Sequence, residues 1–231
     1  MSYKNRITTI AFDADDTLWV NEPYFQEAEM QFCSLLENYL PQHRLSQELF
    51  NTEMKNLPLY GYGIKGFILC MIETANRVSN RAVSLGVIDQ IIEIGHELMQ
   101  KPIELIEGVR ETLEQLKDKY KLIVATKGDL LDQERKLKKS GLEHYFHHIE
   151  IMSEKNIADY QKLLKHIDCQ PESFLMIGNS MKSDIMPVVD LGAYGAYVPF
   201  HVTWAHEQQT QIINDEHFLQ LKKINEILNF L

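Results

Sequence analysis

Two acidic residues, Asp13 and Asp15, stand two positions apart directly after the short apolar run 8–12. An apolar run that opens into polar residues is typical of a buried strand leading into a loop. Two neighbouring carboxylates can share the work of phosphoryl transfer, because one can attack phosphorus while the other protonates the departing alkoxide and then deprotonates water. A metal cation would offset their repulsion. An Asp-x-Asp pair is more often a solvent-facing or helix-capping loop, so the rest of the chain has to decide.

Further apolar runs of strand length recur after a gap. They cover residues 121–126, 148–152, 174–178 and 193–198. Helical patterns lie between these runs, for example at residues 130–139 and 157–167, and Gly141 and Gly192 stand where helices are expected to end. Strands that alternate with helices of this length predict an α/β fold with a mainly parallel, Rossmann-like sheet. The final segment, 218–231, carries apolar residues at helical spacing and predicts a last helix packed on the core.

The stretch from about residue 21 to about residue 101 interrupts this alternation. It contains long amphipathic segments, such as 24–39 and 83–99, and no convincing strand. Pro23 and Pro102 stand near its two ends and disfavour continuing a helix there. We expect two domains, an α/β core and an inserted all-helical domain, made of residues 1–20 with 102–231 and of residues 21–101. An insertion after the first strand would lie above the carboxyl ends of the sheet, where open α/β folds bind ligands, as a lid would.

Three later segments complete a pattern with the first acidic loop. Thr126 ends the second apolar run, Lys155 follows the third, and the fourth leads into Gly-Asn-Ser-Met-Lys-Ser-Asp at residues 178–184. In this order the segments resemble the four motifs of the haloacid dehalogenase superfamily, and the resemblance covers the whole chain. The first motif is matched by Asp13, Asp15, Thr17 and Leu18. The resemblance implies a Rossmann-like core with a helical cap, and a phosphatase-like hydrolase acting on a small phosphorylated metabolite.

The resemblance also implies a role for each motif residue. Asp13 would be the nucleophile that forms an aspartyl-phosphate, and Asp15 the general acid and base. Thr126, Lys127 and Lys155 would bind the substrate phosphate, and the Lys155 ammonium would keep the nucleophile ionised. Taken singly, a strand-end threonine usually caps a helix and a lysine near a helix start is usually solvated. The order of the motifs is therefore what supports these assignments.

Magnesium is the implied cofactor, because the available ligands are oxygens and the cation must bridge nucleophile and phosphate. The expected ligands are the Asp13 carboxylate, the Asp15 backbone carbonyl and Asp184, with Asn179 binding directly or through water. Most members of the superfamily have an acid where this chain has Asn179. An asparagine in an ordinary turn and a helix-capping aspartate would look the same in the sequence.

The segment 60–65, Tyr-Gly-Tyr-Gly-Ile-Lys, is the most unusual part of the insertion. Its glycines allow backbone bends, and Tyr62 and Lys65 could contact a substrate. A turn between two helices with exposed tyrosines explains the same residues equally well.

Three histidines, His144, His147 and His148, cluster before the third strand and suggest a zinc site. No fourth ligand is evident, and loop histidines are mostly solvated, so we expect no metal there. Trp204, in the segment 203–206 after the fifth strand, could border the site or a subunit contact.

The composition limits the classes of partner. The chain has 231 residues, a net charge of -10, 45% hydrophobic residues and three cysteines far apart in sequence. The acidic balance disfavours nucleic acid and anionic membranes, and the scattered cysteines suggest buried thiols. A polar N-terminus without an apolar secretory core is expected of a cytoplasmic protein. We expect a small phosphorylated substrate as partner, and either a monomer or a homodimer.

Two other functions remain open at this level. A 2-haloacid dehalogenase would also attack with Asp13, but a halide leaves without a proton, so an acid at position 15 favours a phosphatase. A non-catalytic protein that binds a phosphorylated ligand is suggested by Asn179, and the presence of Asp13, Asp15 and Lys155 argues against it.

Overall fold

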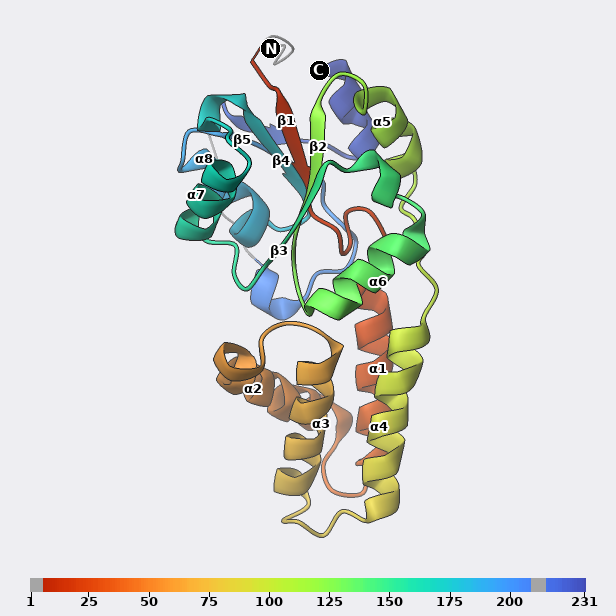
Figure 1. Cartoon of the computed structure of the whole chain (residues 1–231). Helices are drawn as coiled ribbons and strands as arrows, with labels where there is room; N and C mark the ends of the chain where they lie inside the picture. Colours follow the sequence, from red (N-terminus) through yellow and green to blue (C-terminus); the bar gives the residue numbers. More distant parts are fainter. Residues whose placement is uncertain (1–5, 209–214) are drawn as a thin grey trace. The chain divides into compact units, whose positions relative to one another are not determined.

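The computed structural model describes residues 6–208 and 215–231. Its central element is a six-stranded sheet with the strand order β3-β2-β1-β4-β5-β6, in which all neighbouring strands are parallel (Figure 1). The strands are β1 (Thr9–Phe12), β2 (Lys121–Lys127), β3 (His148–Met152), β4 (Phe174–Gly178), β5 (Tyr194–Tyr197) and β6 (Phe218–Gln220). The five apolar runs of the sequence correspond to β1 to β5. The predicted α/β fold with a parallel, Rossmann-like sheet is therefore confirmed.

Helices cover both faces of the sheet, and successive strand residues point to opposite faces. Ile10 and Phe12 are buried on the face covered by α5 (Val109–Leu116) and the later part of α6 (Leu130–Ser140). Ala11, between them, faces α7 (Ile157–His166) and α8 (Met186–Val189). Figure 1 shows α7 and α8 on one side of the sheet and α5 on the other. Strands buried on both faces read as continuous apolar runs, which is why they are visible in the sequence.

Short helical turns occupy several connections of the sheet. They are the 3₁₀-helices Glu143–Tyr145, Pro171–Ser173, Ala205–Glu207 and Ile224–Asn229, and a π-helical turn at Met181–Ile185. The π-helical turn leads directly into α8.

The C-terminal segment corrects one prediction. Instead of one helix over 218–231, the chain forms β6 and then the 3₁₀-helix Ile224–Asn229. β6 pairs with β5, with Gly195 opposite Phe218. Pairing satisfies backbone groups at the edge of β5, and this tertiary gain outweighs the helical spacing of the apolar side chains. Leu221, Ile224 and Ile227 are nevertheless buried in the core that packs on the sheet.

The chain divides into two compact units. The sheet unit comprises Met1–Glu22, Ile103–Lys127 and Glu134–Leu231, and the helical unit comprises Pro23–Pro102 and Gly128–Gln133. The sequence-based boundaries placed residues 128–133 in the core instead. Within the sheet unit the segments that lead out to the insertion and back are paired, because Val20 N–H binds the Glu104 carbonyl and Ile106 N–H binds the Leu18 carbonyl.

The helical unit has a hydrophobic core of its own. Its main helices are α1 (Glu22–Leu35), α2 (Gln42–Tyr60), α3 (Ile64–Val78) and α4 (Leu85–Gln100). Phe32, Leu45, Met71 and Ile91 are fully buried between them. Pro23 is the second residue of α1, where its missing N–H costs no helical hydrogen bond. The core thus buries one face of each helix, as the amphipathic patterns predict.

The remaining features concern thiols and membranes. Cys33 and Cys70 are buried free thiols, and Cys169 is partly exposed. In the described ranges, no helix is both long enough and apolar enough to cross a membrane.

Candidate active site

The carboxyl ends of four adjacent strands bring the predicted motifs to one edge of the sheet. Asp13 directly follows β1, Lys127 ends β2, Lys155 comes shortly after β3, and Asn179 directly follows β4. Because these strands are parallel neighbours, residues after them meet at the same edge.

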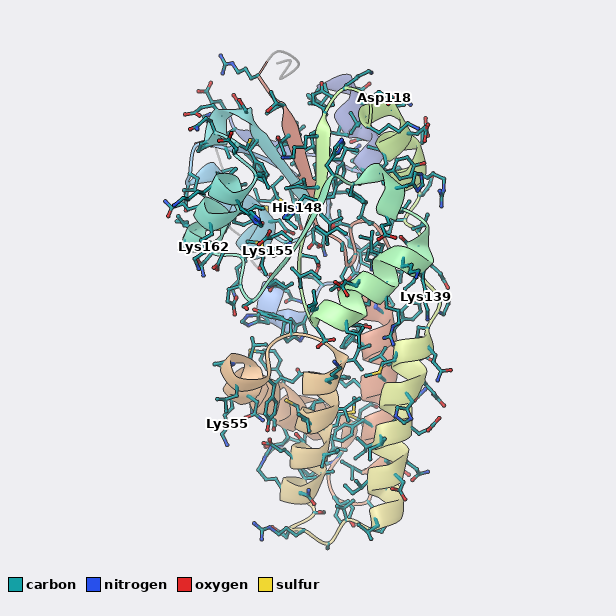
Figure 2. All side chains as sticks on the ribbon, in the orientation of Figure 1. Lys55, Asp118, Lys139, His148, Lys155 and Lys162 are labelled. Carbon is teal, nitrogen blue, oxygen red and sulfur yellow. The ribbon has the colours of Figure 1, made fainter. Side chains whose placement is uncertain are left out.

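Lys155 is the electrostatic centre of this edge. Its Nζ donates to Asp13 Oδ1 at 2.5 Å and to Asp184 Oδ1 at 2.6 Å. Lys155, Asp13 and Asp184 are only 4%, 7% and 1% exposed, so little solvent screens these contacts (Figure 2 labels Lys155). Buried charges of this kind are stable only when paired. The two carboxylates and the ammonium therefore determine one another's positions.

The charges in this cluster shift each other's protonation. Burial raises the pKa of Asp13 to about 7; the Lys155 ammonium opposes this shift and the Asp184 carboxylate adds to it. Burial would lower the pKa of Lys155, but the carboxylates of Asp13 and Asp184 together raise it above its usual range. Lys155 is thus held as a cation against two acidic side chains.

The loop after β1 is a tight turn that aims Thr17 back at the site. The Ala14 carbonyl accepts the N–H groups of Thr17, Leu18 and Trp19. Thr17 Oγ1 lies 3.3 Å from Asp13 Oδ2 and 3.4 Å from Asn179 Oδ1. The hydroxyl therefore connects the loop after β1 to the loop after β4.

Asp15 is held by two donors on other elements. Its Oδ1 accepts from Trp19 Nε1 at 2.8 Å and from Lys136 Nζ at 2.9 Å, and Lys136 also donates to Asn21. Lys136 is 9% exposed. In the sequence Lys136 stands among other charged residues of α6 that look solvated, so it carries no local signal of this contact.

The neighbouring Asp16 has a structural role. It has a left-handed φ of 60°, and its carboxylate accepts the backbone N–H groups of Asn21 and Glu22, where α1 begins. Burial raises the pKa of Asp16 to about 7, and these backbone hydrogen bonds oppose the rise. Asp16 therefore caps the start of α1.

The loop after β4 delivers Asp184 through the π-helical turn Met181–Ile185. Ser180 N–H donates to Asp184 Oδ2 at 2.9 Å, and the Ser180 hydroxyl accepts the Ser183 N–H. A Cβ at Gly178 would lie 2.2 Å from Asp184 Oδ2. Glycine at 178 is therefore required for Asp184 to occupy its place against the end of β4.

Glu207 forms a second charged cluster beside this loop. Its carboxylate accepts from Lys127 Nζ at 2.6 Å, from Ser180 Oγ at 2.5 Å and from Ser183 Oγ at 2.6 Å. Burial would raise the pKa of Glu207, but the Lys127 ammonium and the two hydroxyl donors lower it to about 2. The sequence singles out Trp204 in this segment, whereas Glu207 is the residue that hydrogen-bonds to the loop after β4.

Thr126 and Lys127 end β2 at this edge. The Thr126 side chain is buried and its hydroxyl donates to the Lys127 carbonyl. Lys127 Nζ also lies 3.0 Å from Ser183 Oγ. Phosphate binding by either residue stays a prediction.

Tyr62 and Lys65, predicted as substrate contacts, belong to the helical unit. Lys65 Nζ lies 2.9 Å from both carboxylate oxygens of Asp129, which is in the same unit. Tyr62 is partly buried in the turn between α2 and α3. Their contact with substrate stays a prediction.

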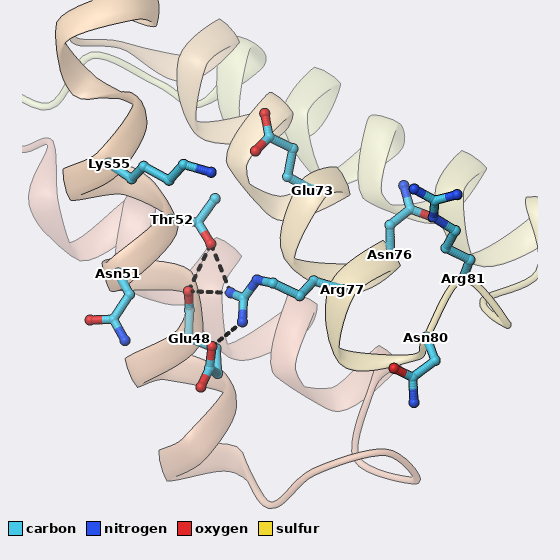
Figure 3. A pocket seen from close by; sticks show the side chains of 9 residues that line it. All are labelled: Glu48, Asn51, Thr52, Lys55, Glu73, Asn76, Arg77, Asn80 and Arg81. Atoms are coloured by element: carbon cyan, nitrogen blue, oxygen red, sulfur yellow. Dashed lines mark hydrogen bonds and ion pairs between the residues drawn. The ribbon is translucent and has the colours of Figure 1, made fainter.

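The helical unit also carries a groove between α2 and α3 of about 910 Å³. Figure 3 shows Arg77 bonded across it to Glu48 and Thr52. The groove is lined by Glu48, Asn51, Thr52, Lys55, Glu73, Asn76, Arg77, Asn80 and Arg81. None of the motif residues contributes to it.

The donor set at the sheet edge fits a magnesium ion. Asp15 and Glu207 each have a lysine partner, Lys136 and Lys127, whereas Asp13 and Asp184 share Lys155. These four carboxyl groups thus share three lysine ammonium groups. Oxygen donors with excess negative charge are what hard divalent cations bind.

Comparison with known proteins identifies the family. Residues 7–191 match the family model described as haloacid dehalogenase-like hydrolase. A solved structure of a haloacid dehalogenase-like family hydrolase from Xanthomonas campestris has 36% sequence identity and a TM-score of 0.85, covering 95% of this chain and 92% of that one. This chain belongs to the haloacid dehalogenase-like hydrolase family. The predicted resemblance to this family is thereby confirmed.

Two curated proteins named glyceraldehyde 3-phosphate phosphatase are similar to this hydrolase. The one from Methanothermobacter thermautotrophicus is 31% identical over 43% of this chain and 47% of its own length. The one from Pyrococcus furiosus is 25% identical over 83% of each chain. The alignment thus spans about half of the first relative and most of the second.

We predict that Glu207→Gln destabilises this hydrolase by about 1–3 kcal/mol at neutral pH, because it replaces the carboxylate that faces the mostly buried Lys127 ammonium by a neutral amide. The folded pKa of Glu207 lies below its unfolded value, so its contribution is present above the unfolded pKa and is lost as the pH falls towards about 2. The difference between wild type and variant should therefore shrink as the pH falls below about 5. Urea unfolding at several pH values measures this.

The matched control is Glu107→Gln, which removes an exposed ion pair with Lys223. Exposed pairs contribute about 0–1 kcal/mol, so this variant should stay close to wild type. An equal loss in both variants, or a difference for Glu207→Gln that does not change with pH, would contradict the assigned role of the cluster.

Proposed function

We propose that this hydrolase cleaves small phosphate monoesters, with Asp13 as nucleophile and Asp15 as general acid and base. The observation that carries the proposal is the buried Lys155 ammonium bonded to both Asp13 and Asp184, with Asp15 two residues beyond the nucleophile. The arrangement supplies an attacking carboxylate, a positive charge beside it and a second carboxyl for proton transfer.

In the first step, a carboxylate oxygen of Asp13 attacks phosphorus and the bond to the ester oxygen breaks. Protonated Asp15 gives its proton to the departing alkoxide, so an alcohol leaves and an aspartyl-phosphate remains. The Lys155 ammonium offsets negative charge on the phosphoryl oxygens. Thr17, bonded to Asp13 Oδ2, restrains the rotation of the nucleophile.

In the second step, Asp15 takes a proton from water and the resulting hydroxide attacks phosphorus. The bond between phosphorus and Asp13 breaks, which releases phosphate and regenerates both carboxyl groups. Trp19 and Lys136 hold Asp15 through one oxygen, and this fixes its orientation for both transfers. We assign Lys136 as a positioning residue on this basis.

The remaining residues at the strand ends would bind the substrate phosphate. Thr126 and Lys155 are the main candidates. The positive charge of Lys127 is already balanced by Glu207. We therefore expect Lys127 to order the loop after β4 as much as to bind phosphate.

Magnesium is the cofactor that we propose, held by Asp13, Asp184 and the Asp15 carbonyl, with Asn179 beside them. When bound, it would neutralise charge on the phosphate and keep the nucleophile ionised. Its absence after chelation should abolish turnover, and added Mg²⁺ should restore it.

The relatives suggest which substrates to test first. Glyceraldehyde 3-phosphate leads the set, together with other small phosphorylated aldehydes, acids and sugars. Within this proposal the enzyme acts on a dissolved metabolite in the cytoplasm. A net charge of -10 disfavours nucleic acid and anionic membranes as partners.

The deciding experiment is a phosphate-release screen over metabolite phosphates with Mg²⁺, run beside 2-chloropropionate with chloride detection. Catalytic release of phosphate supports the proposal. Chloride release without phosphate release would indicate a dehalogenase, and stoichiometric binding without turnover would indicate a ligand-binding protein.

We predict that Asp13→Asn lowers phosphate release by about 10⁴-fold or more while the protein stays folded, because the amide is nearly isosteric but cannot attack phosphorus. Asp190→Asn is the control, since Asp190 is an exposed acid of the sheet unit and should keep wild-type turnover. Activity of Asp13→Asn within tenfold of wild type, with the same Mg²⁺ dependence, would remove the covalent mechanism.

We predict that Asp15→Asn slows the phosphorylation step for alkyl phosphates by roughly 10²–10⁴-fold, the usual effect of losing a general acid. 4-Nitrophenyl phosphate should lose less in this step, because nitrophenolate leaves without a proton. Single-turnover rates for both substrates measure this. An equal loss for the two would argue against Asp15 as the acid.

We predict that Gly178→Ala lowers kcat/KM for 4-nitrophenyl phosphate by about a hundredfold, because the added methyl group must displace Asp184 from Lys155. Gly86→Ala is the control, since the nearest atom to its added Cβ is Ser84 Oγ at 3.8 Å. Normal kinetics in folded Gly178→Ala would show that the position of Asp184 does not limit the reaction.

A further inference from the structure

A histidine and a glutamate on β3 face a histidine at the end of α7. His148, labelled in Figure 2, and Glu150 are two residues apart and therefore point to the same face of the strand. α7 packs on that face of the sheet, with Leu163 and Leu164 buried in the same core as Met152 of β3. His166, the last residue of α7, completes the group.

The donor atoms of these side chains converge on one point. His148 Nε2 lies 2.7 Å and His166 Nδ1 lies 3.2 Å from the same oxygen, Oε2 of Glu150. One ligand atom from each of the three residues lies within 4.8 Å of the others. Ligands of a tetrahedral zinc ion, each about 2 Å from the metal, are separated by roughly 3.3 Å. The observed spacing is thus within a small side-chain adjustment of a coordination site.

We propose that His148, Glu150 and His166 bind one transition-metal ion of the Zn²⁺ class. Two imidazole nitrogens and one carboxylate oxygen suit Zn²⁺, Co²⁺ or Ni²⁺ and not Mg²⁺, which prefers oxygen alone. The side chains of His148, Glu150 and His166 are 28%, 28% and 64% exposed, so water can reach the ion and complete its coordination. The proposed site is separate from the strand-end cluster and does not depend on the proposed function.

Hydrogen bonding alone is the competing explanation. Each histidine can place a proton on the nitrogen that faces Glu150 and donate it to Oε2, which links the three residues without a metal. In the metal-bound form each imidazole is the other neutral tautomer, because the ring nitrogen that faces the ion must carry no proton and the proton then lies on the opposite ring nitrogen. Both forms use the same atoms, so only metal binding separates them.

The sequence grouped His148 with different partners. His147 Nδ1 accepts the Leu122 N–H, and the ring of His144 packs on Tyr145 at 4.0 Å between centroids. The sequence gives no reason to expect a metal among His144, His147 and His148. The proposed group combines His148 with Glu150 and His166 instead.

A metal here would join the outermost strand of the sheet to α7. α7 starts just after Lys155, with the Asn156 side chain accepting the Asp159 N–H, and it carries Tyr160, whose hydroxyl donates to the Ser183 carbonyl. Metal binding should therefore stabilise the sheet unit, by mass action on the folded state.

The test is a competition titration of full-length, chelator-treated protein with Zn²⁺ against a fluorescent zinc chelator, in excess Mg²⁺. The variants are His148→Ala, His166→Ala and Glu150→Gln, and the matched control is His43→Ala, an exposed histidine of the helical unit. Wild type and His43→Ala should bind one Zn²⁺ with equal affinity. Each site variant should bind Zn²⁺ at least about tenfold more weakly. Removing a residue that only supports a metal ligand already costs about 10–100-fold in affinity, so removing a ligand should cost no less.

Two outcomes would overturn the proposal. Equal Zn²⁺ affinity in wild type and the site variants would show that the trio holds no ion. A loss in His43→Ala as large as in the site variants would indicate scattered surface histidines. Glu150→Gln is nearly isosteric and keeps an acceptor oxygen for both histidines, so this variant should remain folded. The visible absorption of bound Co²⁺ should disappear in it.

Discussion

The contact of the Lys155 ammonium with Asp13 and Asp184 is the interaction on which the rest of the site depends. Two carboxylates buried side by side repel each other, and burial alone favours their neutral forms. The lysine makes the arrangement possible, and it comes from a different strand end than either acid. A shift of any of these strands would separate the charges and leave one of them unpaired in a buried position. The charge cluster therefore also constrains the registers of β3 with β2, of β2 with β1 and of β1 with β4.

The loop after β4 shows how the surrounding residues meet this constraint. Asp184 reaches Lys155 only because Gly178 leaves room for its side chain and because a π-helical turn brings it back to the strand. Such turns occur often at functional sites, since they orient side chains that an α-helix would direct elsewhere. Glu207 then binds both serines of the turn and the lysine at the end of β2. Its negative charge is balanced by Lys127 within the cluster, so it orders the loop without adding net charge at the strand ends.

The two units use different kinds of stability. The sheet unit buries charged groups at one edge of a sheet whose two faces are packed with apolar side chains, whereas the helical unit is held by an apolar core. A unit that stabilises itself can change its surface residues without disturbing the strand ends.

The sequence by itself determined the alternation of strands and helices, the helical insertion and the order of Asp13, Thr126, Lys155 and Asp184, because periodicity and strand-end polarity are local properties. Only the tertiary structure decided which distant side chains join them. Lys136 and Glu207 carry no local signal, since a lysine in a charged helix and a glutamate after a loop look solvated until folding buries them. The last segment became a strand, because the edge of β5 offered hydrogen bonds that no spacing of apolar residues reveals. His166 lies beside His148 and Glu150 for the same reason: α7 crosses back over the sheet, and this packing creates the contact.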